Sequence, residues 1–411
     1  MFKFREYQWR IIEKATDIVK NHRFIYLAME VRTGKTLTSL GLAQSLDSKE
    51  VLFVTKKKAI SSIESDYKML NPSFGLSVIN YESLHKIDEE INYDMIILDE
   101  AHTLGAFPKP SKRAKQVKEL IQKHNPYVCL MSGTPTPESY SQMFHQVYGI
   151  PTNPFKEYGS FYKFAKDYID VRQRKINSLY VNDYSRGLIT ILKKMSPMTI
   201  SYSQKEAGFK NQINEVVLEV DLEDSTYWLT SNLKKNLVVE GNEEVILGDT
   251  PAKLMQKLHQ LYSGTIKFES GQSMVLDYSK AAYIAEKFKG KKIAIFYKFR
   301  EEYNALKEIF KDNLCNSLDD FTTYNKNIAL QIVSGREGIS LRQADALVYY
   351  NIDFSATSYW QSRDRMTTKD RTHSKVYWVF SKNGIEKDIY KSVIKKKDYT
   401  VRHFKKDFLN L

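Results

Sequence analysis

The residues with the most distinctive chemistry are Gly34, Lys35 and Thr36, which follow the short apolar run 24–28. Leucines at helical spacing in 37–46 come directly after them, so the pattern is a strand, a tight loop and the start of a helix. A helix N-terminus offers unpaired N–H groups and a partial positive charge, which suit a phosphate. Lys35 is therefore expected to reach the outer phosphates of a nucleotide, and the Thr36 hydroxyl to ligate Mg²⁺.

The loop departs from the usual pattern at one position. The eight-residue phosphate-loop pattern begins with Gly, and this chain has Met29 there. A chance Gly-Lys-Thr at a helix start is the alternative. A second nucleotide motif further along the chain weakens that alternative.

The second motif is Asp99 and Glu100, directly after the apolar run 95–98. Such a run fits a central parallel strand buried on both faces. Acids at its carboxyl end lie where open parallel sheets bind ligands. Asp99 can hold Mg²⁺, and Glu100 can orient and deprotonate an attacking water. The two motifs together predict ATP hydrolysis with Mg²⁺.

Composition limits the class of protein. A chain of 411 residues is too long for one core, so two or three domains are expected. No apolar run approaches the roughly 18–20 residues of a membrane helix, and the start lacks the apolar core of a signal peptide. Cys129 and Cys315 alone predict neither a disulfide framework nor a zinc site. A cytoplasmic protein is expected.

The net charge of +13 suggests a polyanionic partner, most simply nucleic acid. The alternative is a generally lysine-rich composition. Helix faces such as 112–124 carry lysines that would simply face solvent, with no role in binding nucleic acid.

The first part of the chain alternates strands and helices, which predicts a parallel sheet with right-handed crossovers. The expected strands are 24–28, 51–54, 76–79, 95–98 and 127–131, and the expected helices are 1–22 and 111–124. Residues 138–200 are rich in Tyr, Phe and Lys and are expected to be mainly helical. We predict a first domain over 1–202 with this helical extension at its end.

The polar segment 203–215 is predicted to link the domains, and a second α/β domain is predicted over 216–411. The elements expected there are strands at 216–220, 293–297, 328–333, 346–350 and 376–380, a helix at 301–310, and a basic helix at 385–397.

In their order and spacing, these blocks resemble a helicase of superfamily two, closest to the Swi/Snf-type DNA translocases, in a compact, phage-type form with a DEAH-type second motif. The resemblance covers nearly the whole chain. The matching motifs are 4–8 (adenine reading, with Gln8), 29–36, 99–102, Ser132-Gly133-Thr134, 333–341, 361–365 and the closing helix 384–397. Arg32 stands where the family often has Gly, a second departure beside Met29.

The resemblance implies two tandem RecA-like domains, each a parallel sheet flanked by helices, with ATP between them and DNA across both. ATP binding would close the cleft, and hydrolysis would reopen it. The ATP-binding residues that it implies are Arg5, Gln8, Thr33, Gly34, Lys35, Thr36, Gly338, Gln361 and Arg365. The residues that it implies couple hydrolysis to nucleic-acid binding are Ser132, Gly133 and Thr134.

The resemblance also places contacts to DNA phosphates, which position a protein without reading sequence. The residues concerned are Lys56, Lys57, Lys58, Tyr81, Ser334 and Arg336. For Lys56–Lys58 the alternative is a solvated turn. The aromatic residues of 155–185 either stack on a strand or fill the core of a helical subdomain.

The arginine motif is incomplete. The family carries arginines at the fifth and eighth positions counted from Gln361; Arg365 fills the fifth, and the eighth is Thr368. Arg363 and Arg371 are near enough in sequence to replace the missing one.

Three functions remain open from the sequence. The leading one is a monomeric ATPase that translocates on duplex DNA in the cytoplasm, or in the host cytoplasm if a phage encodes it. The alternatives are a strand-separating DNA or RNA helicase and a non-catalytic DNA-binding scaffold of the same fold. The chain shows no nuclease or methyltransferase constellation.

Overall fold

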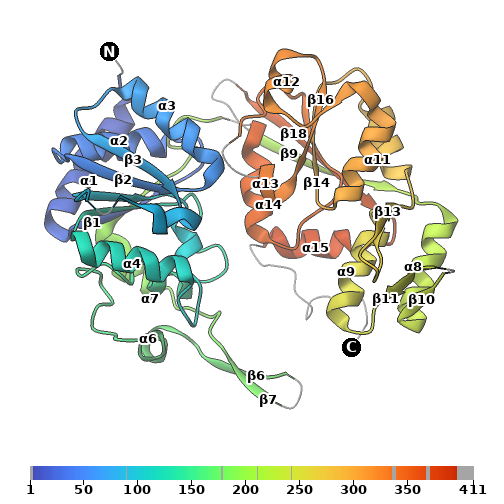
Figure 1. The fold of residues 1–411 in the computed structure, drawn as a ribbon, viewed down its shortest axis with the longest axis horizontal. Helices are drawn as coiled ribbons and strands as arrows, with labels where there is room; N and C mark the ends of the chain where they lie inside the picture. Colours follow the sequence, from blue (N-terminus) through green and yellow to red (C-terminus); the bar gives the residue numbers. More distant parts are fainter. Residues whose placement is uncertain are drawn as a thin grey trace. The chain divides into compact units, whose positions relative to one another are not determined.

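The structure is a computed structural model that describes residues 3–88, 90–176, 179–210, 212–241, 243–335, 339–366 and 371–395. The chain divides into two compact units, Met1–Gly208 and Phe209–Leu411, and the division falls inside the predicted linker (Figure 1). Each unit contains one six-stranded sheet. None of the described helices has the length and apolar character needed to cross a membrane.

The sheet of the first unit has six parallel strands in the order β3-β2-β4-β5-β1-β8. These strands are β3 (Gly75–Asn80), β2 (Glu50–Thr55), β4 (Met95–Leu98), β5 (Tyr127–Met131), β1 (Phe24–Met29) and β8 (Thr199–Tyr202). The strand β5 lies between β4 and β1, so the ends of the two predicted nucleotide motifs are separated by one strand. The predicted α/β class with a parallel sheet is confirmed.

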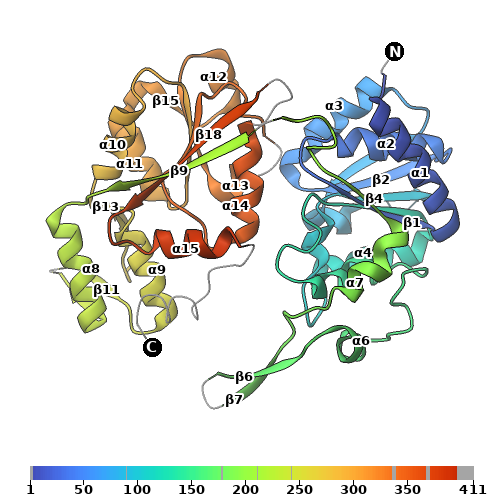
Figure 2. The same ribbon diagram turned by 180° about the vertical axis from the view of Figure 1, so that it is seen from behind.

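Helices cover both faces of this sheet, which explains why its strands read as continuous apolar runs. On one face, alternate strand residues such as Ile25 and Leu27 pack with α1 (Glu6–His22), α2 (Lys35–Ser45) and α3 (Ile60–Leu70). On the other face, Phe24 and Tyr26 pack with α4 (Lys112–His124), α5 (Met143–Val147), α6 (Phe161–Tyr168) and α7 (Thr190–Met195). Figures 1 and 2 show the two helical layers from opposite sides.

The prediction that 138–200 is mainly helical is wrong in part. The segment contains α5, α6 and α7, but also an antiparallel hairpin of β6 (Arg172–Ile176) and β7 (Leu179–Asp183) that projects from the unit (Figures 1 and 2). Its last strand, β8, joins the edge of the sheet beside β1. Most of the aromatic rings expected here fill the core, as Phe155, Phe164 and Tyr168 do.

The sheet of the second unit also has six parallel strands, in the order β15-β16-β14-β17-β18-β9. These strands are β15 (Leu314–Cys315), β16 (Asn327–Gln331), β14 (Ile293–Tyr297), β17 (Ala346–Tyr349), β18 (His373–Ser381) and β9 (Gln212–Val220). The strand β9 starts inside the predicted linker, and β16 ends before Ile332, where the short helix α13 (Ile332–Gly335) begins.

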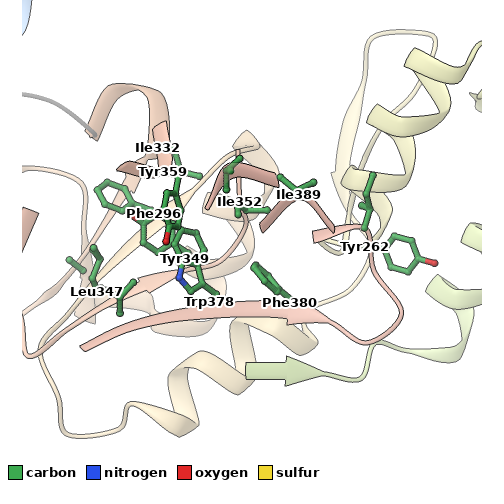
Figure 3. Packing of buried hydrophobic residues seen from close by; sticks show 14 of the residues in the cluster. Tyr262, Phe296, Ile332, Leu347, Tyr349, Ile352, Tyr359, Trp378, Phe380 and Ile389 are labelled. Carbon is green, nitrogen blue, oxygen red and sulfur yellow. The ribbon is translucent and has the colours of Figure 1, made fainter. Parts of the chain in front are cut away.

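Helices cover both faces of the second sheet as well. One core includes α10 (Ser279–Lys287) and α11 (Arg300–Phe310). The other includes α8 (Asp224–Asn236), α9 (Pro251–Leu261), α12 (Leu318–Thr323), α14 (Ala356–Arg363) and α15 (Glu386–Val393). In this core the Trp378 ring stacks on Tyr349 with centroids 3.8 Å apart (Figure 3).

The sequence predicted no individual helices or strands between β9 and β14. Besides its helices it contains two small antiparallel hairpins, β10 (Val238–Glu240) with β11 (Val245–Leu247) and β12 (Thr265–Lys267) with β13 (Ser273–Val275). The predicted tail helix corresponds to α15, and the end of that prediction lies outside the described residues.

Candidate nucleotide-binding site

The loop between β1 and α2 has a backbone that explains its unusual sequence. Met29 is the last residue of β1 and is fully buried in the core, so a large apolar side chain fits where the pattern has Gly. Arg32 takes φ 64° and Gly34 takes φ 81°, both in the left-handed region. The left-handed backbone of Gly34 favours glycine, and a Cβ atom there would also lie 2.5 Å from Gln8 Nε2. Arg32 adopts its conformation at a steric cost that glycine would avoid.

The side chains of the loop fold onto its own carbonyl groups. Lys35 Nζ donates to the carbonyls of Met29 (3.1 Å) and Glu30 (3.4 Å). The buried Thr33 donates from Oγ1 to the Glu30 carbonyl at 2.7 Å. Lys35 and Thr36 are the first two residues of α2, so the ammonium lies at the N-terminus of that helix.

The predicted adenine-reading segment contacts this loop directly. Gln8 is buried, accepts from Arg5 N at 3.1 Å and donates to the Gly34 carbonyl at 3.3 Å. The Tyr7 hydroxyl donates to the Thr33 carbonyl at 3.0 Å and accepts from Arg5 Nη1 at 3.0 Å. The start of α1 therefore supports the loop, and recognition of a base by Gln8 stays a prediction.

Asp99 follows β4 and is held by two neighbouring strand ends. Thr55 Oγ1 at the end of β2 donates to Asp99 Oδ2 at 2.8 Å. The hydroxyl of Tyr81 donates to the Asp99 carbonyl at 2.7 Å. Burial and the adjacent charge of Glu100 raise the pKa of Asp99 to about 6, while the charge of Lys35 opposes this shift. A cation close to this buried carboxylate would stabilise its ionised form.

The pKa of Glu100 is shifted in the opposite direction from that of Asp99. Burial alone would raise its pKa, but the hydrogen bond from His102 and the charges of Lys35 and Lys56 lower the pKa to about 2. Glu100 Oε2 lies 3.1 Å from His102 Nδ1. The backbone of Glu100 has φ 49°, which is uncommon for a residue other than glycine. These contacts favour the ionised form of the Glu100 carboxylate.

The segment Ser132-Gly133-Thr134 follows β5 and touches both nucleotide motifs. Ser132 Oγ accepts from Thr134 N at 3.1 Å and lies 3.0 Å from His102 Nδ1. A Cβ atom on Gly133 would meet the Val31 N atom at 3.4 Å, so this backbone packs against the phosphate loop. The contacts follow from the place of β5 between β4 and β1, and they are compatible with the predicted coupling role.

The predicted DNA contacts of the first unit differ in their surroundings. Lys57 and Lys58 are exposed in the short 3₁₀ helix Lys57–Ala59, just beyond the carboxyl end of β2. Lys56 is half-buried, and its charge helps to lower the pKa of Glu100. Tyr81 is only 1% exposed, and its hydroxyl donates to the Asp99 carbonyl, so it fixes the backbone of the acid pair. The DNA contact expected of Tyr81 stays a prediction.

The predicted residues of the second unit are only partly described. Arg365 follows α14, is 8% exposed, and donates from Nη1 to the Ile339 carbonyl at 3.4 Å. Gln361 lies in α14 and Ser334 in α13, and their side chains are not described. The remaining predictions, for Arg336, Gly338 and Thr368, fall outside the described residues.

Arg363 has a structural partner that the sequence did not reveal. Its Nη1 atom lies 3.0 Å from Glu215 Oε1, and its guanidinium lies over the Trp360 ring at 4.4 Å. Glu215, in β9, also accepts from the hydroxyls of Tyr359 and Tyr390 and from Trp378 Nε1, over 2.8–3.2 Å. Burial and the charge of Glu215 raise the pKa of Tyr390 to about 12. Arg371 donates to the Ala344 carbonyl at 2.7 Å.

A phosphate-type loop and an acid pair at the same edge of a parallel sheet, in a chain with two parallel α/β sheets, are typical of RecA-like ATPases. Within that class, residues 49–195 match the model of the SNF2-related domain, and residues 1–73 match that of the type III restriction enzyme res subunit. Over residues 49–195 the chain is thus similar to an SNF2-related domain.

Two solved structures of a Sulfolobus solfataricus SWI2/SNF2 ATPase core align with most or all of this chain. The one in complex with dsDNA is 14% identical, covers 96% of this chain and 91% of its own, and has a TM-score of 0.42. The other is 16% identical, covers 100% and 91%, and has a TM-score of 0.41. No curated protein matches. The predictions of a phage source and of a DEAH-box group find no support in these comparisons.

The ion pair of Arg363 leads to a prediction about stability. Arg363→Ala should lower the free energy of unfolding by about 1.5–3 kcal/mol, because a hydrogen bond between charged groups is lost beside a mostly buried carboxylate. The exposed Arg342 offers a matched control, since Arg342→Ala removes the same charge from the surface of the same unit. Urea denaturation of both variants measures the effect. Identical midpoints would show that Glu215 is satisfied by its other three partners.

Proposed function

We propose that this protein hydrolyses ATP with Mg²⁺ and uses the reaction to translocate along duplex DNA. The observation that carries the proposal is geometric. The loop after β1 and the acid pair after β4 lie at the same edge of the sheet, and the segment after the intervening strand β5 contacts both, through Ser132 beside His102 and Gly133 beside Val31. The SNF2-related match over 49–195 supports the same chemistry.

The residues present fit Mg²⁺, because the Thr36 hydroxyl and the Asp99 carboxylate are the hard oxygen donors that this ion prefers. When bound, the ion would neutralise phosphate charge. Thr55 keeps the Asp99 carboxylate in place. Lys35 exchanges the carbonyls of Met29 and Glu30 for phosphate oxygens. Glu100, whose ionised form is favoured beside His102, accepts the proton of the attacking water.

Duplex DNA as the partner is supported by charge and position. The chain carries a net charge of +13. Lys57 and Lys58 are exposed at the carboxyl edge of the first sheet, the same edge that holds the nucleotide motifs. Contacts between lysines and phosphates are independent of sequence, as movement along DNA requires.

The catalytic assignment predicts different losses for two substitutions. Lys35→Ala should abolish nucleotide binding, because the loop loses the charge that faces the phosphates. Glu100→Gln should retain ATP binding and nearly stop hydrolysis, because the water loses its base. Binding and turnover are measured separately, with the exposed Glu119→Gln as a control. Undiminished hydrolysis by Glu100→Gln would remove Glu100 from its role.

The choice of nucleic acid is tested on the wild-type chain. Turnover is compared without nucleic acid and with single-stranded DNA, duplex DNA and RNA. Equal rates under all four conditions would contradict DNA translocation.

Salt dependence tests the lysines after β2. Each lost phosphate contact should reduce the slope of log affinity against log salt by about one unit. The Lys56/Lys57/Lys58→Ala variant should therefore bind duplex DNA with a shallower slope than wild type. The control variant Lys112/Lys115/Lys123→Ala loses the same charge from α4 and should keep the wild-type slope. Equal slopes for both triple variants would mean that Lys56–Lys58 are a solvated turn.

Arg365 is proposed to neutralise charge on the transferring phosphoryl group. Arg365→Ala should lower DNA-stimulated turnover by at least about a hundredfold and leave ATP affinity nearly unchanged. Arg363→Ala and Arg371→Ala should cost less turnover, because Arg365 has the matching position in the arginine motif, while Arg363 pairs with Glu215 and Arg371 donates to the Ala344 carbonyl. Steady-state kinetics of the three variants decide the assignment. The largest loss in Arg371→Ala would place the arginine finger there instead.

Strand separation is a second candidate function because of the hairpin β6–β7. It projects from the first unit, and Tyr180 on it is 69% exposed (Figure 1). An exposed aromatic ring on a projecting hairpin can stack on a base at a fork. A forked duplex tests this. If the protein releases one strand in the presence of ATP, and Tyr180→Ala abolishes that release, a helicase is favoured. If the protein displaces a third strand from a triplex without opening the duplex, a translocase is favoured.

A further inference from the structure

The polar residues after β8 do not form a featureless linker. Ser203 N and Oγ both donate to Glu206 Oε2, at 2.7 and 2.6 Å, and Glu206 N donates back to Ser203 Oγ at 3.2 Å. The Tyr202 hydroxyl donates to the Glu206 carbonyl at 3.0 Å. This reciprocal arrangement is that of a capping box, so residues 203–206 form a tight turn with its own internal support.

The turn presents Gln204 to the phosphate-binding loop. Gln204 N donates to Glu30 Oε2 at 2.7 Å, and Gln204 Nε2 donates to the Val31 carbonyl at 3.0 Å. Glu30 N donates to the Tyr202 carbonyl at 2.9 Å, which extends the pairing of β1 with β8 into the loop. Two consecutive loop residues are thus held by the segment that follows the first sheet.

These bonds matter because the rest of the loop depends on contacts that nucleotide binding would change. The Glu30 carbonyl accepts from Thr33 Oγ1 and from Lys35 Nζ, and Met29 also accepts from Lys35. Once Lys35 turns to a phosphate, its two bonds to the loop are lost. The bonds from Gln204 involve neither Lys35 nor a phosphate-facing group, so they can persist in both states.

The same turn is the exit of the first unit. The next residues, Ala207 and Gly208, end that unit, and Gly208 has φ 83°, a left-handed turn in the chain. The backbone that fixes Glu30 and Val31 therefore continues, within a few residues, into the second unit. The loop therefore has a short covalent path to the connection between the units.

We propose that Gln204 is a positioning residue for the phosphate-binding loop, and that the turn Ser203–Glu206 couples nucleotide binding to the connection between the two units. The inference rests on the proposed ATPase function for its second part. Because such coupling is reciprocal, a nucleotide that orders the loop also orders the turn.

Affinity for nucleotide tests the positioning role. Gln204→Met keeps the size of the side chain and removes its donor, and it should weaken Mg-ATP binding about three- to tenfold, the usual effect of one hydrogen bond. Gln204→Glu places a carboxylate against the Val31 carbonyl and beside Glu30, and should bind ATP more weakly still. The control is Lys205→Ala, an exposed residue of the same turn. All measurements are made by titration without DNA on the full chain, together with thermal midpoints, which should stay at the wild-type value.

Hydrogen exchange separates coupling from simple packing. In wild type, Mg-ATP should slow amide exchange in 203–207, and in Gln204→Met this protection should be lost. In the nucleotide-free protein, Gln204→Met should speed exchange in 30–34. Wild-type affinity and wild-type protection in Gln204→Met would overturn the proposal. If the wild-type chain binds no ATP, the proposed function fails, and exchange in 30–34 of the nucleotide-free variant still decides whether Gln204 positions the loop.

Discussion

The parallel direction of the first six strands is the constraint on which the candidate site depends. Since all six run the same way, every strand delivers its next residue to one edge of the sheet. Thr55, Asp99 and Ser132 follow three adjacent strands, and for this reason Thr55 reaches Asp99 and Ser132 reaches His102. The direction itself is imposed by the helical crossovers between strands, which cover both faces and make the strands apolar throughout.

Burial of opposite charges gives that edge its chemistry. Asp99 and Glu100 are neighbours in sequence, yet burial and mutual repulsion raise the pKa of Asp99, while His102 and two lysines hold Glu100 ionised. Two carboxyl groups with separated pKa values can take different roles, one beside a cation and one as a base. The loop after β5 places Ser132 next to His102, so the ring that contacts Glu100 also contacts a third loop of the site.

The sequence was sufficient wherever a segment carried its own signal. Apolar runs identified most sheet strands, and Gly-Lys-Thr and Asp-Glu identified the nucleotide edge. Elements fixed by distant partners were missed. The strand β8 is too short and mixed to be recognised before it pairs with β1. In the sequence, Glu215 looks like an ordinary exposed acid. Only the fold shows that it pairs with Arg363 and accepts hydrogen bonds from two tyrosine hydroxyls and one tryptophan N–H. Tyr81 resembled a surface contact because nothing local shows that its hydroxyl reaches Asp99.

The pairing of β9 with β18 has a consequence for synthesis on the ribosome. The first strand of the second unit pairs along its whole length with the last strand of that sheet, from Gln212 beside His373 to Val220 beside Ser381. In a nascent chain that stops before His373, β9 has an unpaired edge and Glu215 lacks Trp378 and Tyr390. All strands of the first sheet, in contrast, are complete by Tyr202. The first unit can therefore fold during translation, whereas the second must wait until the strand that ends at Ser381 has been synthesised.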